Sequence, residues 1–375
     1  MTKSLIVTIT DETNYGNRLQ NYALNSLLMN YGSCDTAEFV LGVSDRRAYI
    51  RARMNGVKRL MHLRNVKVMF QCLMHPQSMK YRLIRKRLDA MARFTDRYIP
   101  YNKYRITEFR NLEIRNKDVY DTVVLGSDQI WNYRWLSLNE LRLRLGSFAK
   151  TDVKVISYAA SFGIESIDSE DACNIFEKCL PKLRAISVRE DRGKELVEEL
   201  AHVPATVVLD PTLMLTSEQW KRVTSSFVAT DDRYVLTYFL GRPSPEQQQC
   251  IDEYARAHNC RVRKILYLGD PETYIAGPGD FVELFAKAQY VFTDSYHACC
   301  FSILFHKQFT VFTRSGLSIQ ENMNSRMETL FRLFQLDSVV MDSGIAPVID
   351  YDKVDRLLEQ HRVESRAWLD AAMER

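Results

Sequence analysis

The chain has 375 residues, of which 46% are hydrophobic and 26% charged, and its formal net charge is +4 at pH 7. This length exceeds the size at which a single hydrophobic core usually stops growing, so we expect two domains. No apolar run approaches the ~20 residues that a membrane span needs, and the first residues show no signal-peptide pattern, so we expect a cytoplasmic protein. The eight cysteines are scattered without a C-x-x-C pair, and we infer neither a disulfide nor a metal site.

Positive charge is concentrated in residues 46–117. This stretch holds 20 of the 51 Lys and Arg residues but only 4 of the 47 Asp and Glu residues. The plainest explanation is a solvated helical face; the functional explanations are an anionic membrane surface, an acceptor that carries a diphosphate, or nucleic acid. Nucleic acid is the least favoured because no recognition motif accompanies the charge, and we expect no nucleic-acid partner.

The first predicted unit is a buried strand at Leu5–Ile9, a polar loop, and a helix over Leu19–Met29. The loop contains neither a G-x-G-x-x-G nor a Walker pattern, so the dinucleotide and P-loop fingerprints are absent. It does place amide and backbone donors just before a helix, where they could hold a sugar hydroxyl or an anion, although Asn and Gly also form ordinary loops. These candidate acceptor-binding residues are Asn14, Tyr15, Gly16 and Asn17.

A second strand is expected at Thr36–Val40, and the pattern from residue 44 to about residue 97 is helical and basic. We interpret residues 44–117 as a basic helical insertion in the first domain. Such an insertion could lie over a cleft, against a membrane surface, or simply against the rest of the protein.

The strand Val119–Leu125 is followed by hydrogen-bonding side chains at its carboxyl end. Ser127 and Gln129 suit a polyhydroxylated acceptor, Trp131 could stack on it, and Asp128 is a candidate general base. The next strand, Val153–Tyr158, ends in a small-residue turn at which Ser161 could approach the acceptor.

Arg189 lies where a short strand gives way to a helix. Its planar guanidinium could fork onto carboxylate or phosphate oxygens, or it could pair with Glu190 and Asp191 at the surface. The segment beginning at Asp210 marks the expected crossover between domains.

The second half repeats the alternation of strand and helix, with strands at Tyr234–Phe239 and Arg261–Leu268 and helices at Pro245–His258 and Phe281–Ala288. The alternation predicts an α/β fold with two Rossmann-like, doubly wound domains facing a cleft. We expect residues 1–212 to form the acceptor side and residues 213–345 the donor side. Residues 346–375 are expected to form a helix that packs back on the first domain.

The most informative stretch is the apolar run that begins at Tyr290 and ends at the cap-type residues Thr293, Asp294 and Ser295. The cap places His297 in the first turn of the next helix, at the carboxyl edge of a sheet. Ligands bind at this edge in open α/β sheets, and a helix N-terminus suits phosphate or carboxylate, although a lone histidine can also simply pack. Arg326, near the start of a later helix, could reach the cleft or serve only as a capping or surface residue.

Six blocks, in order, resemble the polysaccharide pyruvyl transferase family. They are Asn14–Ala23, Leu125–Asn132, Ser157–Gly163, Ser187–Asp191, Leu209–Thr212 and Thr293–His297. The resemblance implies a GT-B-like fold and transfer of pyruvate from phosphoenolpyruvate to a sugar as a ketal, with phosphoenolpyruvate as donor substrate and no further cofactor. It also implies that Arg189 and His297 hold the donor. Many members carry an arginine shortly before the histidine, where this chain has Ser295 and Tyr296, so another cation such as Arg18 or Arg326 would complete the donor site, or the donor differs.

The chemistry leads to a hypothesis for each residue. His297 would bind the phosphate and act as general acid, Arg189 would neutralise the donor, and Asp128 or Asp294 would take the proton of the sugar hydroxyl. The acceptor could be linked to a lipid diphosphate, with the protein peripheral at the inner face of the cell membrane. Two alternatives stay open: a GT-B glycosyltransferase that uses a nucleotide sugar, and a non-catalytic partner that docks polysaccharide assembly enzymes to the membrane.

Overall fold

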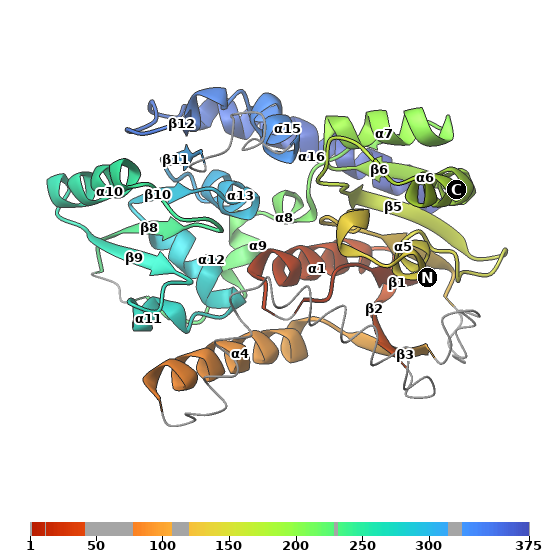
Figure 1. Cartoon of the computed structure of the whole chain (residues 1–375), viewed down its shortest axis with the longest axis horizontal. Coiled ribbons are helices and arrows are strands. Elements are labelled where there is room, and N and C mark those ends of the chain that lie inside the picture. Colours follow the sequence, from red (N-terminus) through yellow and green to blue (C-terminus); the bar gives the residue numbers. More distant parts are fainter. Residues whose placement is uncertain are drawn as a thin grey trace.

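The computed structural model describes residues 2–11, 13–41, 78–106, 120–228, 232–313 and 325–374. Their strands form two sheets, one in each half of the chain, and every pairing between the strands is parallel (Figure 1). Helices are interleaved with the strands in both halves, as parallel pairing requires crossover connections. The predicted fold of two Rossmann-like α/β units is therefore confirmed.

The first sheet has seven strands in the order β3-β2-β1-β4-β5-β6-β7. Its strands are β1 (Thr2–Val7), β2 (Gly32–Leu41), β3 (Tyr101–Ile106), β4 (Thr122–Leu125), β5 (Lys154–Ala160), β6 (Ala185–Val188) and β7 (Thr206–Val207). The helices of this half are α1 (Tyr15–Leu28), α4 (Met79–Tyr98), α5 (Leu138–Arg144), α6 (Glu170–Cys179) and α7 (Asp191–Ala201), with short 3₁₀ turns η1 (Tyr133–Trp135) and η2 (Leu180–Lys182). Every residue of β4 is buried, as expected for a parallel strand covered on both faces, and three of its four residues, Val123, Val124 and Leu125, are apolar.

The second sheet has five strands in the order β12-β11-β10-β8-β9. Its strands are β8 (Tyr234–Tyr238), β9 (Arg261–Ile265), β10 (Tyr290–Thr293), β11 (Phe309–Phe312) and β12 (Val340–Met341). The helices that follow the first sheet are α8 (Pro211–Met214), α9 (Ser217–Lys221), α10 (Pro245–Ala257), α11 (Pro271–Tyr274), α12 (Pro278–Lys287), α13 (Tyr296–Leu304), α15 (Ser325–Phe334), η3 (Asp337–Val339) and α16 (Tyr351–Glu374). The strand order reverses between β1 and β4 in the first sheet and between β8 and β10 in the second, and such reversals are where open α/β sheets bind ligands.

Helix α16 extends from the second half toward the first (Figure 1). The Ser365 hydroxyl accepts a hydrogen bond from the Leu209 amide at 3.0 Å, and the Met373 carbonyl accepts one from Lys154 Nζ at 2.6 Å. The C-terminal helix therefore contacts the first sheet and the segment that follows it. The boundaries at residues 212 and 345 stay predictions; the first sheet ends at Val207 and the second begins at Tyr234.

Most of the predicted basic insertion, residues 44–77 and 107–117, lies outside the described residues. Within it, α4 is a helix as predicted. Its N-cap is Ser78, whose side chain accepts a hydrogen bond from the Tyr81 amide. Residues 101–106 were expected to be part of a helical insertion; instead they form β3, the edge strand that pairs with β2. Helix α4 packs against α11 and α12 of the second half.

Candidate active site

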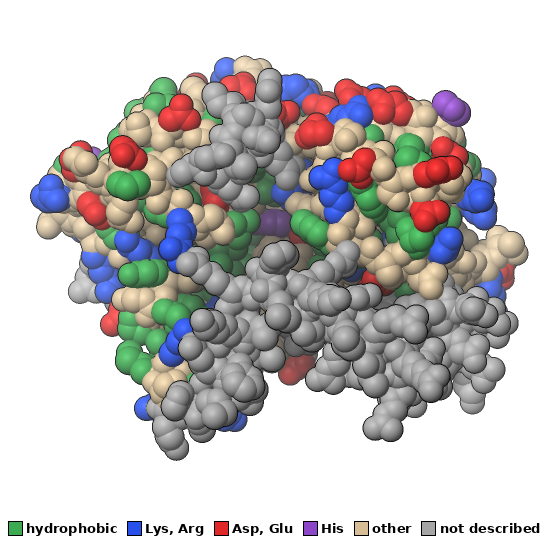
Figure 2. Space-filling view, viewed as in Figure 1, with side chains coloured by type: hydrophobic (Ala, Val, Ile, Leu, Met, Phe, Trp, Pro, Cys, Tyr) green, Lys and Arg blue, Asp and Glu red, His purple; other side chains and the backbone are tan. Residues whose placement is uncertain are grey.

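A cavity of about 330 Å³ lies between the two halves, at the carboxyl ends of β1, β4, β8 and β10. Figure 2 looks onto a hollow between the halves, with a histidine side chain visible at its bottom. The lining residues are Ile9, Asp11, Asn14, Asn17, Asp128, Gln129, Trp135, Tyr238, Leu240, Asp294, Ser295, Tyr296, His297, Arg326 and Met327. Both strand-order reversals thus open onto one space, the expected position for a ligand in this fold.

Helix α13 begins at the cavity wall in the way that the sequence predicts. Ser295 is its N-cap, Tyr296 its first residue, and His297 lies in its first turn. The Ser295 side chain makes no capping hydrogen bond, so the first-turn amides are not satisfied by the cap. Because Ser295, Tyr296 and His297 all line the cavity, this helix start directs positive potential into the cavity.

The His297 imidazole is 8% exposed, and its Nε2 atom lies 4.0 Å from Asp210 Oδ2 without a hydrogen-bond partner among the described residues. Burial lowers the pKa of His297 below its ordinary value, although Asp210 and Asp128 oppose the shift. The ring packs against α1, since a Cβ atom on Gly16 would lie 2.3 Å from Nδ1. Gly16 does not line the cavity; it makes room for the imidazole, which corrects its predicted role as an acceptor ligand.

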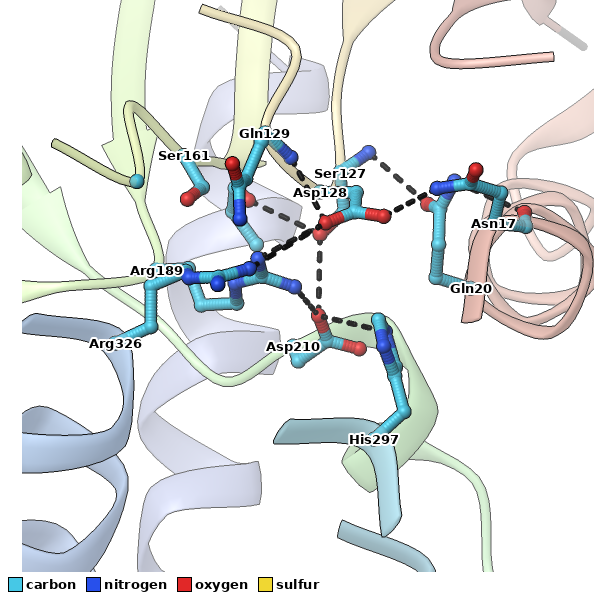
Figure 3. Close-up of polar contacts among 12 residues, drawn as sticks. Asn17, Gln20, Ser127, Asp128, Gln129, Ser161, Arg189, Asp210, His297 and Arg326 are labelled. Atoms are coloured by element: carbon cyan, nitrogen blue, oxygen red, sulfur yellow. Dashed lines mark hydrogen bonds and ion pairs between the residues drawn. The ribbon is translucent and has the colours of Figure 1, made fainter. Parts of the chain in front are cut away.

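Arg189 lies at the centre of a buried charge cluster (Figure 3). Its Nη1 atom is 2.6 Å from Asp210 Oδ2, its Nη2 atom is 3.1 Å from Asp128 Oδ1, and its side chain is fully buried. The guanidinium carbon also lies 4.4 Å from the centre of the Tyr296 ring. Because two carboxylates occupy the guanidinium and Arg189 does not line the cavity, the structure does not give it the direct donor contact that the family resemblance implied.

The alternative surface pair between Arg189 and its neighbours is also wrong. Asp191 pairs with Arg332 at 2.8 Å, and Glu190 is fully buried. The Glu190 carboxylate accepts hydrogen bonds from the Phe162 amide at 2.8 Å and from the Ser161 hydroxyl at 2.9 Å. Both neighbours therefore have partners other than Arg189.

Asp128 and Asp210 are both held in the ionised form. Burial would raise the pKa of the Asp128 carboxyl, but Arg189 opposes it and the pKa falls to about 2. Burial would also raise the pKa of Asp210, but Arg189, His297 and the Thr212 amide together outweigh it, so this pKa is lowered as well. Asn17 Nδ2 donates a further hydrogen bond to Asp128. A carboxylate with so low a pKa is a weak proton acceptor, which argues against the prediction that Asp128 is the general base.

Arg326 is the only Lys or Arg among the described residues that line the cavity. Its Nη1 atom lies 3.9 Å from Asp128 Oδ1, and the Gln129 amide oxygen, when turned toward it, lies 2.6 Å from Nη2. Burial and the nearby Arg189 lower the pKa of Arg326 to about 10, so it remains charged at neutral pH. Arg18, the other candidate cation, donates instead to the Ile9 carbonyl at 3.2 Å and to the Tyr101 hydroxyl, and it does not line the cavity.

Apart from Gly16, the predicted acceptor-binding residues divide into two groups. Asn14, Asn17 and Gln129 line the cavity as expected. The others are buried and bonded elsewhere: the Ser127 hydroxyl donates to the Ala159 carbonyl, the Ser161 hydroxyl to Glu190, Trp131 Nε1 to the Arg144 carbonyl, and the Tyr15 hydroxyl to the Ala276 carbonyl. The predictions that these four side chains meet the acceptor are wrong, because their polar atoms stabilise the walls of the cavity.

Tyr15 instead joins the two halves. Its ring centre lies 4.8 Å from that of Phe281 in the second half, and it makes no contact with solvent. Arg87 of α4 lies 5.1 Å from the Tyr15 ring centre, and its Nε atom donates to the hydroxyl at 3.2 Å. The tyrosine therefore fixes the start of α1, and with it Asn14 and Asn17, relative to the second half.

Asp294 lines the cavity, but backbone amides use its carboxylate. Oδ1 accepts a hydrogen bond from the Leu240 amide at 2.6 Å, and Oδ2 accepts one from the Gly241 amide at 2.9 Å. The side chain thus holds the loop that follows β8. Its role as proton acceptor stays a prediction.

Sequence reasoning missed Asp210 and Trp135. The Asp210 side chain accepts a hydrogen bond from the Thr212 amide and caps α8, and an Asp before a Pro is an N-cap signal that was interpreted only as a domain crossover. Nothing in the local sequence distinguishes Trp135, which is 57% exposed, from the fully buried Trp131 four residues earlier. Trp135 is the more exposed of the two because η1, which carries it, lies at the cavity.

Fold and site together define an α/β protein with two Rossmann-like units and a cavity that His297, Arg326 and the start of α13 line. A family model described as "Polysaccharide pyruvyl transferase" matches residues 14–316, so the chain belongs to the polysaccharide pyruvyl transferase family. Membership makes it a transferase of polysaccharide biosynthesis and confirms the resemblance seen in the sequence.

Several solved structures are similar over nearly the whole chain. A putative UDP-N-acetylglucosamine 2-epimerase from Listeria monocytogenes shares 12% identity at a TM-score of 0.46, with 97% of each chain covered. The UDP-GlcNAc 2-epimerase from Methanocaldococcus jannaschii shares 12% sequence identity at a TM-score of 0.45, and the match covers 96% of this chain and 92% of that one. The E. coli ADP-heptose LPS heptosyltransferase II shares 9% sequence identity at a TM-score of 0.34, and the match covers 96% of this chain and 99% of that one. No curated protein matches the chain.

Proposed function

We propose that the protein transfers the pyruvyl group of phosphoenolpyruvate to a sugar of a polysaccharide or of a lipid-linked precursor, and that the product is a cyclic ketal. The observation that carries this proposal is the cavity wall, where the His297 imidazole, the Arg326 guanidinium and the start of α13 face one space. Phosphoenolpyruvate carries a phosphate and a carboxylate, so it needs two centres of positive potential. Family membership supports the same reaction.

The donor site follows from these groups. The phosphate fits the start of α13 beside His297, because backbone amides and the helix dipole favour an anion there. The carboxylate fits Arg326, whose planar guanidinium can donate two parallel hydrogen bonds. Arg189 does not contact the donor; it holds Asp128, Asp210 and the Tyr296 ring in position.

The reaction requires one general acid and one proton acceptor. The methylene carbon of the enol takes a proton from His297, and a sugar hydroxyl attacks the adjacent carbon and releases its own proton. Phosphate then leaves with the electron pair of its C–O bond. A second hydroxyl of the sugar attacks the same carbon, closes the ring and returns its proton to His297. Because the free imidazole has a lowered pKa, the bound phosphate is needed to raise that pKa and protonate His297. Asp294 is the remaining candidate for proton acceptor.

The proposal is tested with purified protein, one donor and two competing nucleotide probes. Phosphoenolpyruvate is expected to raise the melting temperature, and ³¹P NMR is expected to show inorganic phosphate only when an acceptor glycan is present. Uridine and guanosine diphosphates serve as competing probes. Stabilisation by a nucleoside diphosphate but not by phosphoenolpyruvate would reject pyruvyl transfer and favour a glycosyltransferase that uses a nucleotide sugar.

Replacing Arg326 by Met is expected to weaken phosphoenolpyruvate binding. A hydrogen bond to a charged group is worth about 1.5–3 kcal/mol, so the dissociation constant should rise by roughly 10- to 100-fold. Isothermal titration calorimetry measures this change. Arg356→Met, at an exposed position of α16 outside the cavity, is the matched control and should bind as wild type does. Unchanged affinity in Arg326→Met would remove Arg326 from the donor site.

The exposed face of α4 is the surface that we propose meets an anionic membrane. Arg82, Arg85, Lys86, Arg93 and Arg97 are exposed and, by their spacing, lie on one face of the helix. Among the described helices none is long and apolar enough to cross a bilayer. Because each Lys or Arg near an anionic surface contributes about 1 kcal/mol, a lipid-linked acceptor could be met by electrostatic contact alone.

Changing Arg82, Arg85 and Arg93 together to Gln is expected to weaken binding to phosphatidylglycerol vesicles by about 100-fold. Vesicle cosedimentation at increasing salt measures the effect, and wild-type binding should fall steeply with ionic strength. The control replaces three exposed basic residues of α16, Lys353, Arg356 and Arg366, by Gln. Equal losses in both triple variants, or binding insensitive to salt, would show that α4 has no special role.

A further inference from the structure

The mouth of the cavity carries two large apolar side chains that the donor chemistry does not use. Trp135 and Leu240 both line the cavity, yet they are 57% and 56% exposed. They come from opposite halves, since Trp135 ends η1 and Leu240 follows β8. His297 and Asp128, in contrast, are 8% and 7% exposed. The cavity therefore changes from a charged floor to an apolar rim.

Backbone hydrogen bonds hold both rim residues in place. The Trp135 amide donates to the Asn132 carbonyl at 3.2 Å, and the Leu240 amide donates to Asp294 Oδ1 at 2.6 Å. On η1, Tyr133 bonds to Asp168 through its hydroxyl. The backbone that carries the indole is thus held in place, while much of the indole surface faces solvent. A fixed backbone lowers the conformational entropy that is lost when a ligand covers the side chain.

Polar side chains surround this rim within the same cavity. Asp11, Asn14 and Gln129 line it from the first half and offer carboxylate and amide groups. A pyranose ring presents a face of C–H groups and an edge of hydroxyls, so an indole can cover the face while carboxylate and amide groups bond the edge. Exposed apolar surface that is bordered by such polar groups is typical of a ligand-binding site.

We propose that Trp135 and Leu240 form the acceptor subsite, in which the apolar face of one pyranose ring of the acceptor packs on the Trp135 indole. Leu240 flanks the ring from the opposite half, and two hydroxyls point inward to the donor at His297. The inference rests on the proposed function for the reaction itself, but it assigns a sugar site that can be tested without that reaction. Because the rim faces solvent, the remainder of a glycan can extend out of the cavity.

Tryptophan fluorescence tests this subsite directly. The chain has four tryptophans, of which Trp131 and Trp220 are fully buried, Trp368 is partly buried, and Trp135 is exposed. Acrylamide should therefore quench chiefly Trp135. The methyl glycosides of β-galactose, β-glucose and N-acetyl-β-mannosamine are the probes, and at least one is expected to protect the wild-type fluorescence from acrylamide. In Trp135→Phe the protectable component should vanish. Uridine protecting Trp135 when no glycoside does, or no protection at all, would overturn the proposal.

Kinetics with the Trp135→Ala variant separate this inference from the proposed reaction. Truncation of a central aromatic contact usually costs more than 1–2 kcal/mol, so we expect the acceptor KM to rise about tenfold or more. The rise in melting temperature caused by phosphoenolpyruvate should equal that of wild type, because His297 and Arg326 are unchanged. Leu138→Ala, at a partly exposed position outside the cavity, is the control.

The outcomes differ for the two proposals. Ketal formation with an unchanged acceptor KM in Trp135→Ala would overturn the subsite and leave pyruvyl transfer standing. Protection of Trp135 by a glycoside in a protein that neither binds nor consumes phosphoenolpyruvate would support the subsite and reject pyruvyl transfer.

Discussion

Replacing His297 by Gln is expected to lower turnover with phosphoenolpyruvate by about 10²–10⁴-fold, the usual contribution of a general acid or base. The imidazole lines the cavity in the first turn of α13, and its Nε2 atom has no hydrogen-bond partner among the described residues. Gln retains a polar side chain that Gly16 leaves room for, so the variant should fold. Phosphate release under saturating donor and acceptor measures the loss.

The pH dependence gives a second signature of His297. Its pKa in the free protein lies below the ordinary value of about 6.5, so kcat/KM should fall as the pH rises through a value lower than 6.5. Bound phosphate stabilises the imidazolium, and the corresponding fall in kcat should lie at higher pH. Both falls should vanish in His297→Gln. His306→Gln, an exposed residue paired with Asp355, should keep both. Near-wild-type turnover in correctly folded His297→Gln would remove the histidine from the chemistry.

Replacing Arg189 by Met is expected to lower the free energy of unfolding by about 3–5 kcal/mol. The change leaves Asp128 and Asp210 buried together without the cation between them. Urea denaturation, followed by circular dichroism, measures the loss. Arg192→Met is the matched control: its partners Glu195 and Glu199 lie on the surface, and such pairs contribute about 0–1 kcal/mol.

The double variant Arg189→Met with Asp210→Asn should recover part of the loss, because it removes one of the two unpaired charges.

The pH dependence of the free energy of unfolding has a defined sign. The folded-state pKa values of Asp128 and Asp210 are lowered, so their stabilisation is complete above the unfolded value near 3.8 and is lost as the pH falls toward about 2. This acid-induced loss should largely disappear in Arg189→Met. An Arg189→Met protein as stable as wild type would contradict the structural role assigned to Arg189.

The sequence alone determined the repeating elements and one part of the site. Apolar runs and cap residues are local signals, and they correctly placed β4, β8 and β10 and put His297 in the first turn of α13. Six short blocks in order were enough to recognise the family.

Only the tertiary structure decided which side chains face the ligand. Arg189 meets Asp128 and Asp210, which lie 61 and 21 positions away, and no local pattern records such distant partners. The same limit explains why the sequence did not show that Arg326 lines the cavity and Arg18 does not. It also explains why the sequence did not show that Trp135 is exposed while Trp131 is buried. Periodicity and caps fix where a helix or strand begins, but the packing of one element on another decides whether a side chain is buried, paired, or open to a substrate.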